Sequence, residues 1–293
     1  MKNSLKQFIQ LNLPAIEQEM VTLVQKISGP EHLKESMLYS LNAGGKRIRP
    51  LFVAAVCEMY NKAIEPSYTV GAAVEMIHTY SLIHDDLPCM DDDDLRRGKP
   101  TNHIVYGESM AVLAGDALNS LAFGVLARMD IDAEQRIELI NLLSLTAGAE
   151  GMVGGQILDM DGEQRQLNLT ELENVHINKT GALLRFSIES GAILADVSPE
   201  DRAALVDYAH HIGLAFQIQD DILDIIGTSE ELGKTAGKDV ASDKSTYPAL
   251  LTLEGAKAKL DTHYELAIAA LEKIETDSSL LREFAQYIVK RTY

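Results

Sequence analysis

The chain has 293 residues, of which 46% are hydrophobic, so it can bury a large core, and its composition is not that of a disordered protein. It carries 26 Lys and Arg against 44 Asp and Glu, a formal net charge of −18 that disfavours binding to nucleic acid and to anionic membrane surfaces. The 2 cysteines match no disulfide or zinc-ligand pattern, and there is neither an apolar signal core nor a run of about 18 apolar residues, so we expect a soluble cytoplasmic protein without a membrane span.

The N-terminal part of the chain has the period of amphipathic helices. Apolar residues recur at spacings of three and four over residues 8–24, until Ser28-Gly29-Pro30 interrupts the pattern. A second helix is predicted from about residue 32 to the glycine pair at 44–45. The next segment, Lys46-Arg47-Ile48-Arg49-Pro50, places three cations on a turn, and its proline suits the first turn of a new helix. Such a basic helix start can bind an anion, although an ordinary basic surface turn is an equally good interpretation.

The most unusual stretch follows a helix predicted from Val70 to His84. Six aspartates stand within ten residues in Asp85-Asp86-Leu87-Pro88-Cys89-Met90-Asp91-Asp92-Asp93-Asp94, directly before Arg96-Arg97. Carboxylates are hard oxygen donors suited to Mg²⁺ or Ca²⁺, and paired arginines match phosphate oxygens. The stretch therefore predicts a metal-bridged phosphorylated ligand, with a solvated acidic loop as the alternative. An EF-hand is excluded, because the run from Asp91 has an arginine where that loop requires glycine.

Helical patterns continue through the middle of the chain. Residues 109–129 are rich in Ala, Leu and Gly and carry few charges, which indicates a helix buried on most sides or lying at a subunit interface. Residues 133–145 and 148–160 keep the helical period, and the second of these holds Gln156 and Asp159 on one face.

Two helices in the second half carry polar groups in apolar surroundings. The capping-box pattern Thr170-Glu171-Leu172-Glu173 predicts the start of a long helix that contains Lys179 and Thr180. Another helix opens at Pro199 and runs to Asp224. Its polar residues Gln217, Asp220, Asp221 and Asp224 fall on a single stripe. The stripe could be solvated, but the apolar neighbours on the other faces favour one that lines an interior cavity.

The C-terminal part offers no second domain. Gly233-Lys234-Thr235 resembles a nucleotide phosphate loop only loosely, because the upstream glycine and the preceding strand are missing, so we reject that function. Two amphipathic helices are predicted over 248–275 and 278–291. We find no strand pattern of useful length, no internal repeat and no linker, so we expect one all-helical domain over residues 1–293.

The two aspartate clusters, at 85–91 and 220–224, each end a long apolar helix. Two carboxylate walls that face each other would hold several Mg²⁺ ions, whose remaining ligands would be phosphate oxygens of a substrate. Metal bound in this way makes diphosphate a good leaving group. The pattern thus favours chemistry at a diphosphate ester.

Several motifs in this order resemble the trans-prenyl diphosphate synthase family. Its two aspartate-rich motifs are matched by 85–91 with Arg96-Arg97 and by 220–224. Further similarity lies in Gly44-Gly45-Lys46-Arg47-Ile48-Arg49-Pro50, Gly155-Gln156-Ile157-Leu158-Asp159, Lys179-Thr180, Phe216-Gln217 and Gly233-Lys234. The resemblance covers about residues 40 to 250. It implies the isoprenoid synthase fold, a single all-α bundle of about 10–13 helices around a central cavity, and a homodimer.

Residue roles follow from the resemblance at the matching positions. It implies that about three Mg²⁺ ions per active site are held by Asp85, Asp86, Asp91, Asp159, Asp220, Asp221 and Asp224. The allylic diphosphate is expected at Arg96, Lys179 and Lys234, with Thr180, Gln217 and Lys244 completing this catalytic site. The isopentenyl diphosphate is expected at Lys46, Arg49, His78 and Arg97. These cations would neutralise anionic substrates locally in an acidic protein.

The resemblance also implies the reaction and its product. In this prenyltransferase reaction of isoprenoid biosynthesis, the allylic C–O bond ionises, the double bond of isopentenyl diphosphate attacks the cation, and the released diphosphate takes the final proton. Tyr80, five residues before Asp85, resembles the large aromatic residue of the bacterial enzymes that make the fifteen-carbon farnesyl product, and Ser81 is the small residue beside it. We therefore expect farnesyl diphosphate. Alternatives are a geranyl or geranylgeranyl diphosphate synthase, a terpene cyclase, and a non-catalytic isoprenoid-binding subunit.

Overall fold

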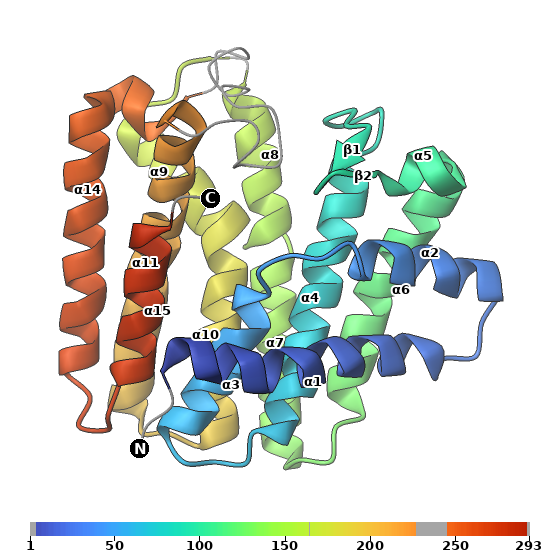
Figure 1. The fold of residues 1–293 in the computed structure, drawn as a ribbon, viewed down its shortest axis with the longest axis horizontal. Helices are drawn as coiled ribbons and strands as arrows, with labels where there is room; N and C mark the ends of the chain where they lie inside the picture. Colours follow the sequence, from blue (N-terminus) through green and yellow to red (C-terminus); the bar gives the residue numbers. More distant parts are fainter. Residues whose placement is uncertain (1–3, 164, 227–244, 292–293) are drawn as a thin grey trace.

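The computed structural model describes residues 4–163, 165–226 and 245–291, and helices dominate these ranges, as predicted (Figure 1). The helices, in chain order, are α1 (Leu5–Gln25), α2 (Glu31–Leu41), α3 (Ile48–Met59), α4 (Glu65–Asp85), α5 (Asn102–Tyr106), α6 (Glu108–Ala127), α7 (Ala133–Ala147), α8 (Met152–Gly162), α9 (Leu169–His176), the π-helix η1 (Ile177–Gly181), α10 (Ala182–Ala195), α11 (Pro199–Ile226), α14 (Tyr247–Glu272) and α15 (Ser279–Lys290). The described strands, β1 (Leu95–Arg96) and β2 (Lys99–Pro100), pair antiparallel after α4.

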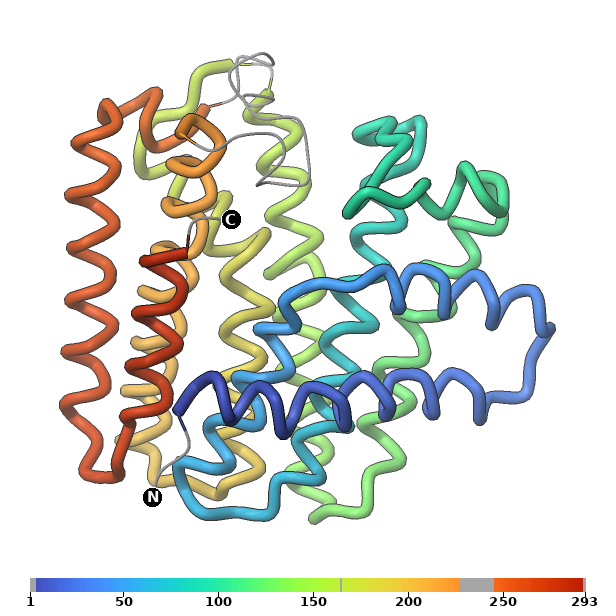
Figure 2. Tube along the Cα trace, in the orientation of Figure 1, coloured from blue at the N-terminus to red at the C-terminus, as the bar shows by residue number. Residues whose placement is uncertain are grey.

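The core of the bundle is made by helices that are apolar on most sides. In Figure 2, α3 and α10 lie in the middle, with α11, α14 and α15 on one side and α4, α6 and α7 on the other. Phe52 of α3, Tyr208 of α11 and Phe284 of α15 pack together in one apolar cluster. A second cluster joins α4, α6 and α7, and α10 contributes side chains to both. Burial of this much apolar surface is the main stabilisation of the fold.

The acidic ends of the helices lie at one end of the bundle. In Figure 1 the C-terminal ends of α4, α8 and α11 all lie towards the top of the molecule. These ends carry Asp85, Asp159 and Asp224, respectively, in or near the last turn. The fold therefore brings together the acidic segments that are far apart in the sequence.

One helix start differs from the prediction. The capping box was predicted at Thr170, but α9 is capped by Asn168, whose side chain accepts a hydrogen bond from the Glu171 N–H at 3.0 Å. The Glu171 carboxylate in turn accepts the Asn168 N–H at 2.9 Å. Asparagine caps a helix as well as threonine does, and Glu173 is engaged with Lys259 at 2.9 Å. The Thr170 prediction was therefore wrong by two residues.

Helix α6 is apolar on both of its faces. Ala111 and Leu118 are buried in the core, whereas the side chains of Val112 and Leu113 are 38% and 55% exposed. By length and composition alone, α6 is the one described helix that could cross a membrane, which the search for uninterrupted apolar runs did not indicate. This is weak support for a membrane span, because core helices of soluble proteins meet the same criterion. The exposed apolar face is also what a subunit interface requires.

Candidate active site

The first aspartate motif forms a compact loop at the end of α4. The backbone N–H of Asp91 donates to the carbonyl oxygen of Asp85 at 2.8 Å, which closes the segment between them. Within the described parts of the chain, the carboxylates of Asp85 and Asp91 make no side-chain hydrogen bond or ion pair. Burial raises the pKa of Asp85 to about 6. The positive charge of Lys179 opposes this rise, and the negative charge of Asp91 adds to it. A cation bound here would relieve this cost.

Asp86 has a different environment from Asp85. It is 3% exposed, and its two oxygens accept hydrogen bonds from Nε of Arg96 at 2.7 and 3.0 Å. Arg96 lies on β1, so the short hairpin returns this guanidinium to the end of α4. Such a two-oxygen contact fixes both partners. The predicted metal residue Asp86 and the predicted diphosphate residue Arg96 thus hold each other in place.

The aspartates of the second motif have different environments: Asp220 lines a cavity, whereas Asp221 and Asp224 are buried. Asp220 lies beside the basic cavity described below, and its carboxylate pairs with Arg291 at 2.8 Å. Asp221 is 4% exposed and accepts hydrogen bonds from the Tyr247 N–H at 3.0 Å and from Nε2 of Gln217 at 3.1 Å. Asp224 is also buried. The predicted stripe therefore does not face the cavity along its whole length, because Asp221 anchors α11 to the start of α14.

The backbones of helix α8 and the π-helix η1 are in close contact. A Cβ atom at Gly155 would lie 2.2 Å from the backbone nitrogen of Lys179, so only glycine allows this approach. The contact brings Nζ of Lys179 to 2.6 Å from Oδ2 of Asp159. In η1 the hydroxyl of Thr180 donates to Oε1 of Gln217 on α11 at 3.2 Å. The sequence predicted one continuous helix here, whereas a π-helical turn, common at functional sites, interrupts it.

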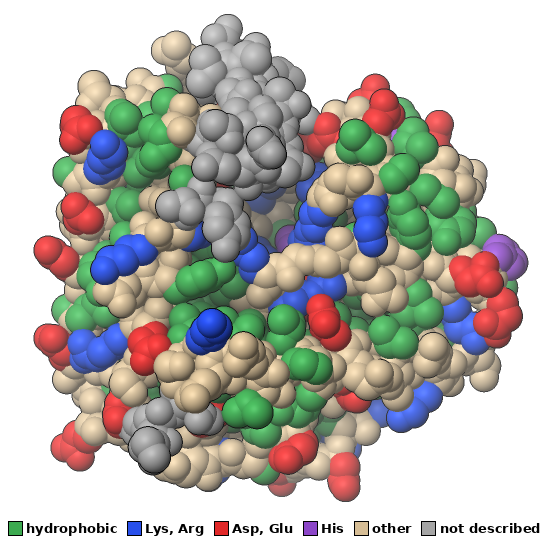
Figure 3. Space-filling view, in the orientation of Figure 1, with side chains coloured by type: hydrophobic (Ala, Val, Ile, Leu, Met, Phe, Trp, Pro, Cys, Tyr) green, Lys and Arg blue, Asp and Glu red, His purple; other side chains and the backbone are tan. Residues whose placement is uncertain are grey.

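A basic cavity of about 530 Å³ lies between the start of α3, α4 and α11. Its lining includes the four residues predicted for isopentenyl diphosphate, Lys46, Arg49, His78 and Arg97, together with Arg291. Nε of Arg49 is buried and has no hydrogen-bond partner among the described residues. Figure 3 shows Lys and Arg side chains bordering a hollow in the middle of this face, while most of the acidic side chains lie nearer the edge. A buried cation without an acceptor is costly, so the cavity is suited to an anion.

His78 is not one of the cations of this cavity. Burial first, and then the charges of Arg49, Arg97, Arg47 and Arg96, hold the pKa of His78 well below its usual range. The imidazole is therefore neutral in the unliganded site and can offer one donor and one acceptor. The four predicted residues thus comprise three cations and one neutral hydrogen-bonding group.

Arg47 also lines this cavity, but its charge is engaged in a buried ion pair. Its backbone is left-handed, with φ of 48°, and its guanidinium pairs with Glu75 at 2.8 Å inside the protein. Both side chains are at most 3% exposed. Arg47 also donates to the carbonyl oxygen of Leu41. The ion pair holds the turn so that Lys46 and Arg49, on either side, both line the cavity.

An apolar cavity of about 490 Å³ adjoins the basic one, and the two share Arg49, His78 and Thr180. Asp85 and Lys179 lie at its polar part, whereas Tyr80 and Ser81 line it further down α4. The remaining lining includes Met90, Met152, Val153, Ile157, Met160 and Leu183. Several of these apolar side chains are exposed, such as Ile157 at 54%. A flexible apolar chain attached to an anionic head would fit the combined space.

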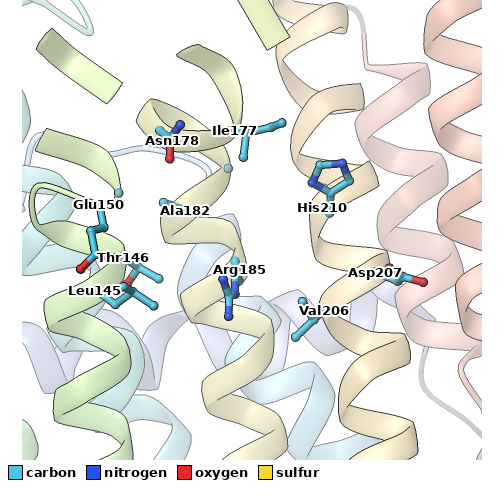
Figure 4. Close-up of a pocket in the computed structure, with 12 residues that line it drawn as sticks. Leu145, Thr146, Glu150, Ile177, Asn178, Ala182, Arg185, Val206, Asp207 and His210 are labelled. Atoms are coloured by element: carbon cyan, nitrogen blue, oxygen red, sulfur yellow. The ribbon is translucent and has the colours of Figure 1, made fainter. Parts of the chain in front are cut away.

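A third cavity, of about 530 Å³, contains none of the predicted site residues (Figure 4). Residues of α7, η1, α10 and α11 line it, including Arg185 of α10 and His210 of α11. Its lining also includes Glu150 and Asp207, so both signs of charge are represented. Because the acidic motifs and the basic turn meet at the other two cavities, we assign the candidate site to those.

The outcome for the predicted residues is therefore uneven. The basic or the apolar cavity is lined by Lys46, Arg49, His78, Tyr80, Ser81, Asp85, Arg97, Lys179, Thr180, Gln217 and Asp220. Asp86 and Arg96 instead line a smaller neighbouring cavity, and Asp159 is joined to the site through Lys179. Asp91, Asp221 and Asp224 line none of these cavities. Lys234 and Lys244 lie outside the described residues. Arg291 was not predicted as a site residue. It lies two residues before the end of the sequence, where no motif or periodicity marks it. Its guanidinium lies 4.0 Å above the Phe216 ring and donates to the Phe216 carbonyl oxygen at 2.7 Å.

Several known proteins are similar to this chain, among them farnesyl and geranylgeranyl diphosphate synthases. The profile of the family described as polyprenyl synthetase matches residues 30–283. The farnesyl diphosphate synthase of Bacillus subtilis is 51% identical over 296 residues, with 100% of both chains covered. That of Geobacillus stearothermophilus is 46% identical over 99% of both chains. A crystal structure of an FPP/GFPP synthase from Zymomonas mobilis superimposes with a TM-score of 0.86 at 40% identity, covering 97% of this chain and 98% of that one.

Proposed function

The chain belongs to the polyprenyl synthetase family, and on that premise we propose that it is a farnesyl diphosphate synthase. It is an all-α prenyltransferase with the isoprenoid synthase fold. It joins isopentenyl diphosphate to dimethylallyl diphosphate and then to geranyl diphosphate, head to tail. The full-length identity to farnesyl diphosphate synthases supports this assignment.

One observation carries the proposal at the level of the site. The buried Nε of Arg49, which has no acceptor among the described residues, lies at the cavity that adjoins the open carboxylate of Asp85. A buried N–H without an acceptor and a carboxylate with a raised pKa are each unfavourable alone. A diphosphate accompanied by a divalent cation would satisfy both. Charges that are costly without a ligand are typical of a site built for one.

The family generally uses Mg²⁺, and the residues present fit this ion. No three described His, Cys, Asp or Glu side chains converge closely enough to form a complete site. Mg²⁺ commonly binds through one or two carboxylates, substrate phosphates and water. We propose Asp85, Asp91 and Asp220 as direct ligands of about three ions, with Asp86, Asp159, Asp221 and Asp224 near or behind them. Bound Mg²⁺ would stabilise the negative charge that develops on the departing diphosphate.

The protein residues would bind and orient the two substrates. Lys179 and Arg96, joined by Lys234 and Lys244, would hold the allylic diphosphate, and Thr180 and Gln217 would complete its site. Lys46, Arg49 and Arg97 would hold isopentenyl diphosphate, with His78 as a neutral hydrogen-bond partner. These roles match the two adjoining cavities, which share Arg49, His78 and Thr180.

The bond changes follow from this placement of the substrates. The allylic C1–O bond breaks, and its electron pair leaves with diphosphate. The isopentenyl double bond then forms the new carbon–carbon bond at C1, and a proton is lost from C2 of the isopentenyl unit to the released diphosphate. The apolar side chains of α8 and α10, including Ile157 and Leu183, would exclude water from the cation. Fixed charges and orientation thus supply most of the catalysis.

We propose that Tyr80 sets the fifteen-carbon product length. It lines the apolar cavity on the same helix as Asp85, further from the helix end, so a chain growing away from the diphosphate would meet its ring. Ser81, whose hydroxyl donates to the His78 carbonyl oxygen at 2.9 Å, lines the cavity beside it. A larger aromatic residue at Ser81 would shorten the space, whereas a small residue at Tyr80 would lengthen it.

We further propose a cytoplasmic homodimer of single-domain subunits over residues 1–293. The exposed apolar residues Val112 and Leu113 on α6, and Ile137 and Leu145 on α7, support an interface between copies on these helices. Sedimentation of the purified protein should give a dimer, and Leu113→Asp should weaken it. A stable monomer at micromolar concentration would remove this part of the proposal.

The direct test supplies Mg²⁺, isopentenyl diphosphate and dimethylallyl diphosphate to the purified protein. Chromatography of the dephosphorylated products should give farnesol. Geranylgeraniol as the main product would instead support the longer-chain synthase. No condensation product at all would refute the enzyme and favour a non-catalytic isoprenoid-binding subunit.

A further inference from the structure

His84 lies between the residue proposed to limit the product and the first aspartate motif. It occupies the last turn of α4, directly before Asp85 and one turn after Tyr80. All three side chains line the apolar cavity. The diphosphate and metal sites described above give His84 no role. Its side chain is 27% exposed, so it is neither a core residue nor a freely solvated one.

The orientation of His84 is fixed by helix α6. Its Nε2 lies 3.0 Å from the backbone carbonyl oxygen of Val112. A carbonyl oxygen can only accept a hydrogen bond, so Nε2 must carry a hydrogen and donate it. The carboxylate of Asp116 lies 3.9 Å from the same nitrogen. The Nε2 edge of the imidazole is thus held against α6.

The seat for this ring exists because residue 115 is glycine. A Cβ atom at Gly115 would lie 2.2 Å from Nε2, 2.6 Å from Cδ2 and 3.0 Å from Cε1 of His84. Three atoms of the His84 ring therefore occupy the volume that a side chain at position 115 would fill. A side chain there would displace the imidazole, and loss of the hydrogen bond to Val112 would leave its orientation unfixed.

The same imidazole supports the ring of Tyr80. The two rings meet edge to face, with centroids 5.4 Å apart and an interplanar angle of 83°. This is a favourable geometry for an aromatic pair. Gly115, His84 and Tyr80 therefore form a continuous stack from α6 to the wall of the apolar cavity.

We infer that His84 is a positioning residue for product length, which holds the Tyr80 ring across the path of the growing chain. This inference rests on the proposed function, because it concerns the product of that reaction. His84 acts through Tyr80 and touches neither diphosphate. Without the imidazole, the Tyr80 ring turns into the vacated space, and the cavity admits a further isoprene unit.

The test measures the ratio of twenty-carbon to fifteen-carbon product from geranyl diphosphate and isopentenyl diphosphate. His84→Ala should raise this ratio by roughly fivefold to tenfold, the change expected for losing one aromatic contact. His84→Phe keeps a ring against Tyr80 and should restore much of the wild-type ratio. His32→Ala, an exposed histidine on α2, is the matched control and should leave the ratio unchanged.

A double-mutant comparison separates action through Tyr80 from an independent effect. Tyr80→Ala and Tyr80→Ala/His84→Ala should give the same product ratio, because nothing remains for His84 to hold. Gly115→Ala should reproduce the effect of His84→Ala by displacing the imidazole. If Gly115→Ala fails to fold, His84→Ala and the double variant still decide the question.

The outcomes also distinguish this inference from the proposed function. If the wild-type protein makes no condensation product, the proposed function fails. If the wild type makes the fifteen-carbon product and His84→Ala gives an unchanged ratio, only the inference fails. An effect of His84→Ala that adds fully to that of Tyr80→Ala would also overturn it.

Discussion

The amino group of Lys179 lies 2.6 Å from Oδ2 of Asp159, on helices that meet only because residue 155 is glycine. In the proposed reaction, the metal ions and the allylic diphosphate would compete for these two partners. A lysine already paired with a carboxylate is held in place before the substrate arrives, so little rearrangement is needed when it exchanges that partner for a phosphate oxygen.

Replacing Lys179 should therefore reduce the rate of the chemical step. Lys179→Ala removes one charge from the departing diphosphate and should lower kcat roughly 10²- to 10³-fold, the usual cost of losing one such donor. Lys179→Arg should recover part of the loss. Lys257→Ala, at an exposed surface pair with Glu254, is the control. A kcat for Lys179→Ala within about threefold of wild type in steady-state assays would contradict the assigned role.

Arg49 should show opposite effects on stability and on substrate binding. Arg49→Met removes a buried guanidinium whose Nε has no described acceptor, so the ligand-free protein should melt at the same or a higher temperature. The KM for isopentenyl diphosphate should rise roughly 10- to 100-fold, because a charge-assisted contact is lost.

The matched control is Arg165→Met at an exposed ion pair with Glu171, which should leave the KM unchanged. Thermal unfolding with and without isopentenyl diphosphate measures both properties. A clear fall in the melting temperature of ligand-free Arg49→Met would show that the guanidinium has a stabilising partner, against the structure.

Asp85 should make the stability of the metal-free protein depend on pH. Its pKa is about 6 in the folded protein against the ordinary 3.8, so between these values the folded state holds a proton that the unfolded chain has released. The contribution of Asp85 therefore becomes less favourable as the pH rises through this window, and its full cost is present above about pH 6.

Asp85→Asn removes this cost. In EDTA the variant should exceed wild type in stability at pH 7.5, by on the order of 1–3 kcal/mol, and the gain should shrink towards pH 4.5. Asp94→Asn, in the same loop but exposed, should show no such trend. Equilibrium urea unfolding at several pH values gives the comparison. A gain that is constant with pH would exclude the proposed titration.

The Arg47–Glu75 pair should be essential for folding stability. Glu75→Gln leaves the Arg47 charge buried without its partner, so the free energy of unfolding should fall by about 3–5 kcal/mol. Glu254→Gln, which breaks the exposed pair with Lys257, should cost less than about 1 kcal/mol. Denaturant unfolding of the two variants would measure this contrast. Equal losses in the free energy of unfolding would show that burial does not determine how much an ion pair stabilises the protein.

Much of the fold and of the site could be predicted from the sequence, because the signals are local. The period of apolar residues predicted most helices and placed Asp85 at the end of α4, whereas Asp220 lies more than one turn before the last residue of α11. Residue type alone suggested anion binding by Lys46 and Arg49. These features depend on neighbours within one or two helical turns, which a sequence displays directly.

The remaining features depend on contacts between distant segments. Nothing near Arg47 predicts that it pairs with Glu75, whereas Arg49, two residues later, stays unpaired at Nε. The π-helix around Lys179 arises from packing against Gly155, and the Arg291 contact with Asp220 joins the end of the chain to α11. Tertiary contacts select among local alternatives, as they also do for the cap at Asn168.

We propose that the two adjoining cavities bring an allylic diphosphate and isopentenyl diphosphate together for condensation. A single-turnover experiment tests it most directly: excess protein is loaded with geranyl diphosphate and Mg²⁺, mixed with labelled isopentenyl diphosphate, and quenched over time. We expect the label to appear in farnesyl diphosphate, and Arg49→Met to delay its appearance at low isopentenyl diphosphate. Label that remains in isopentenyl diphosphate throughout would contradict the proposed condensation.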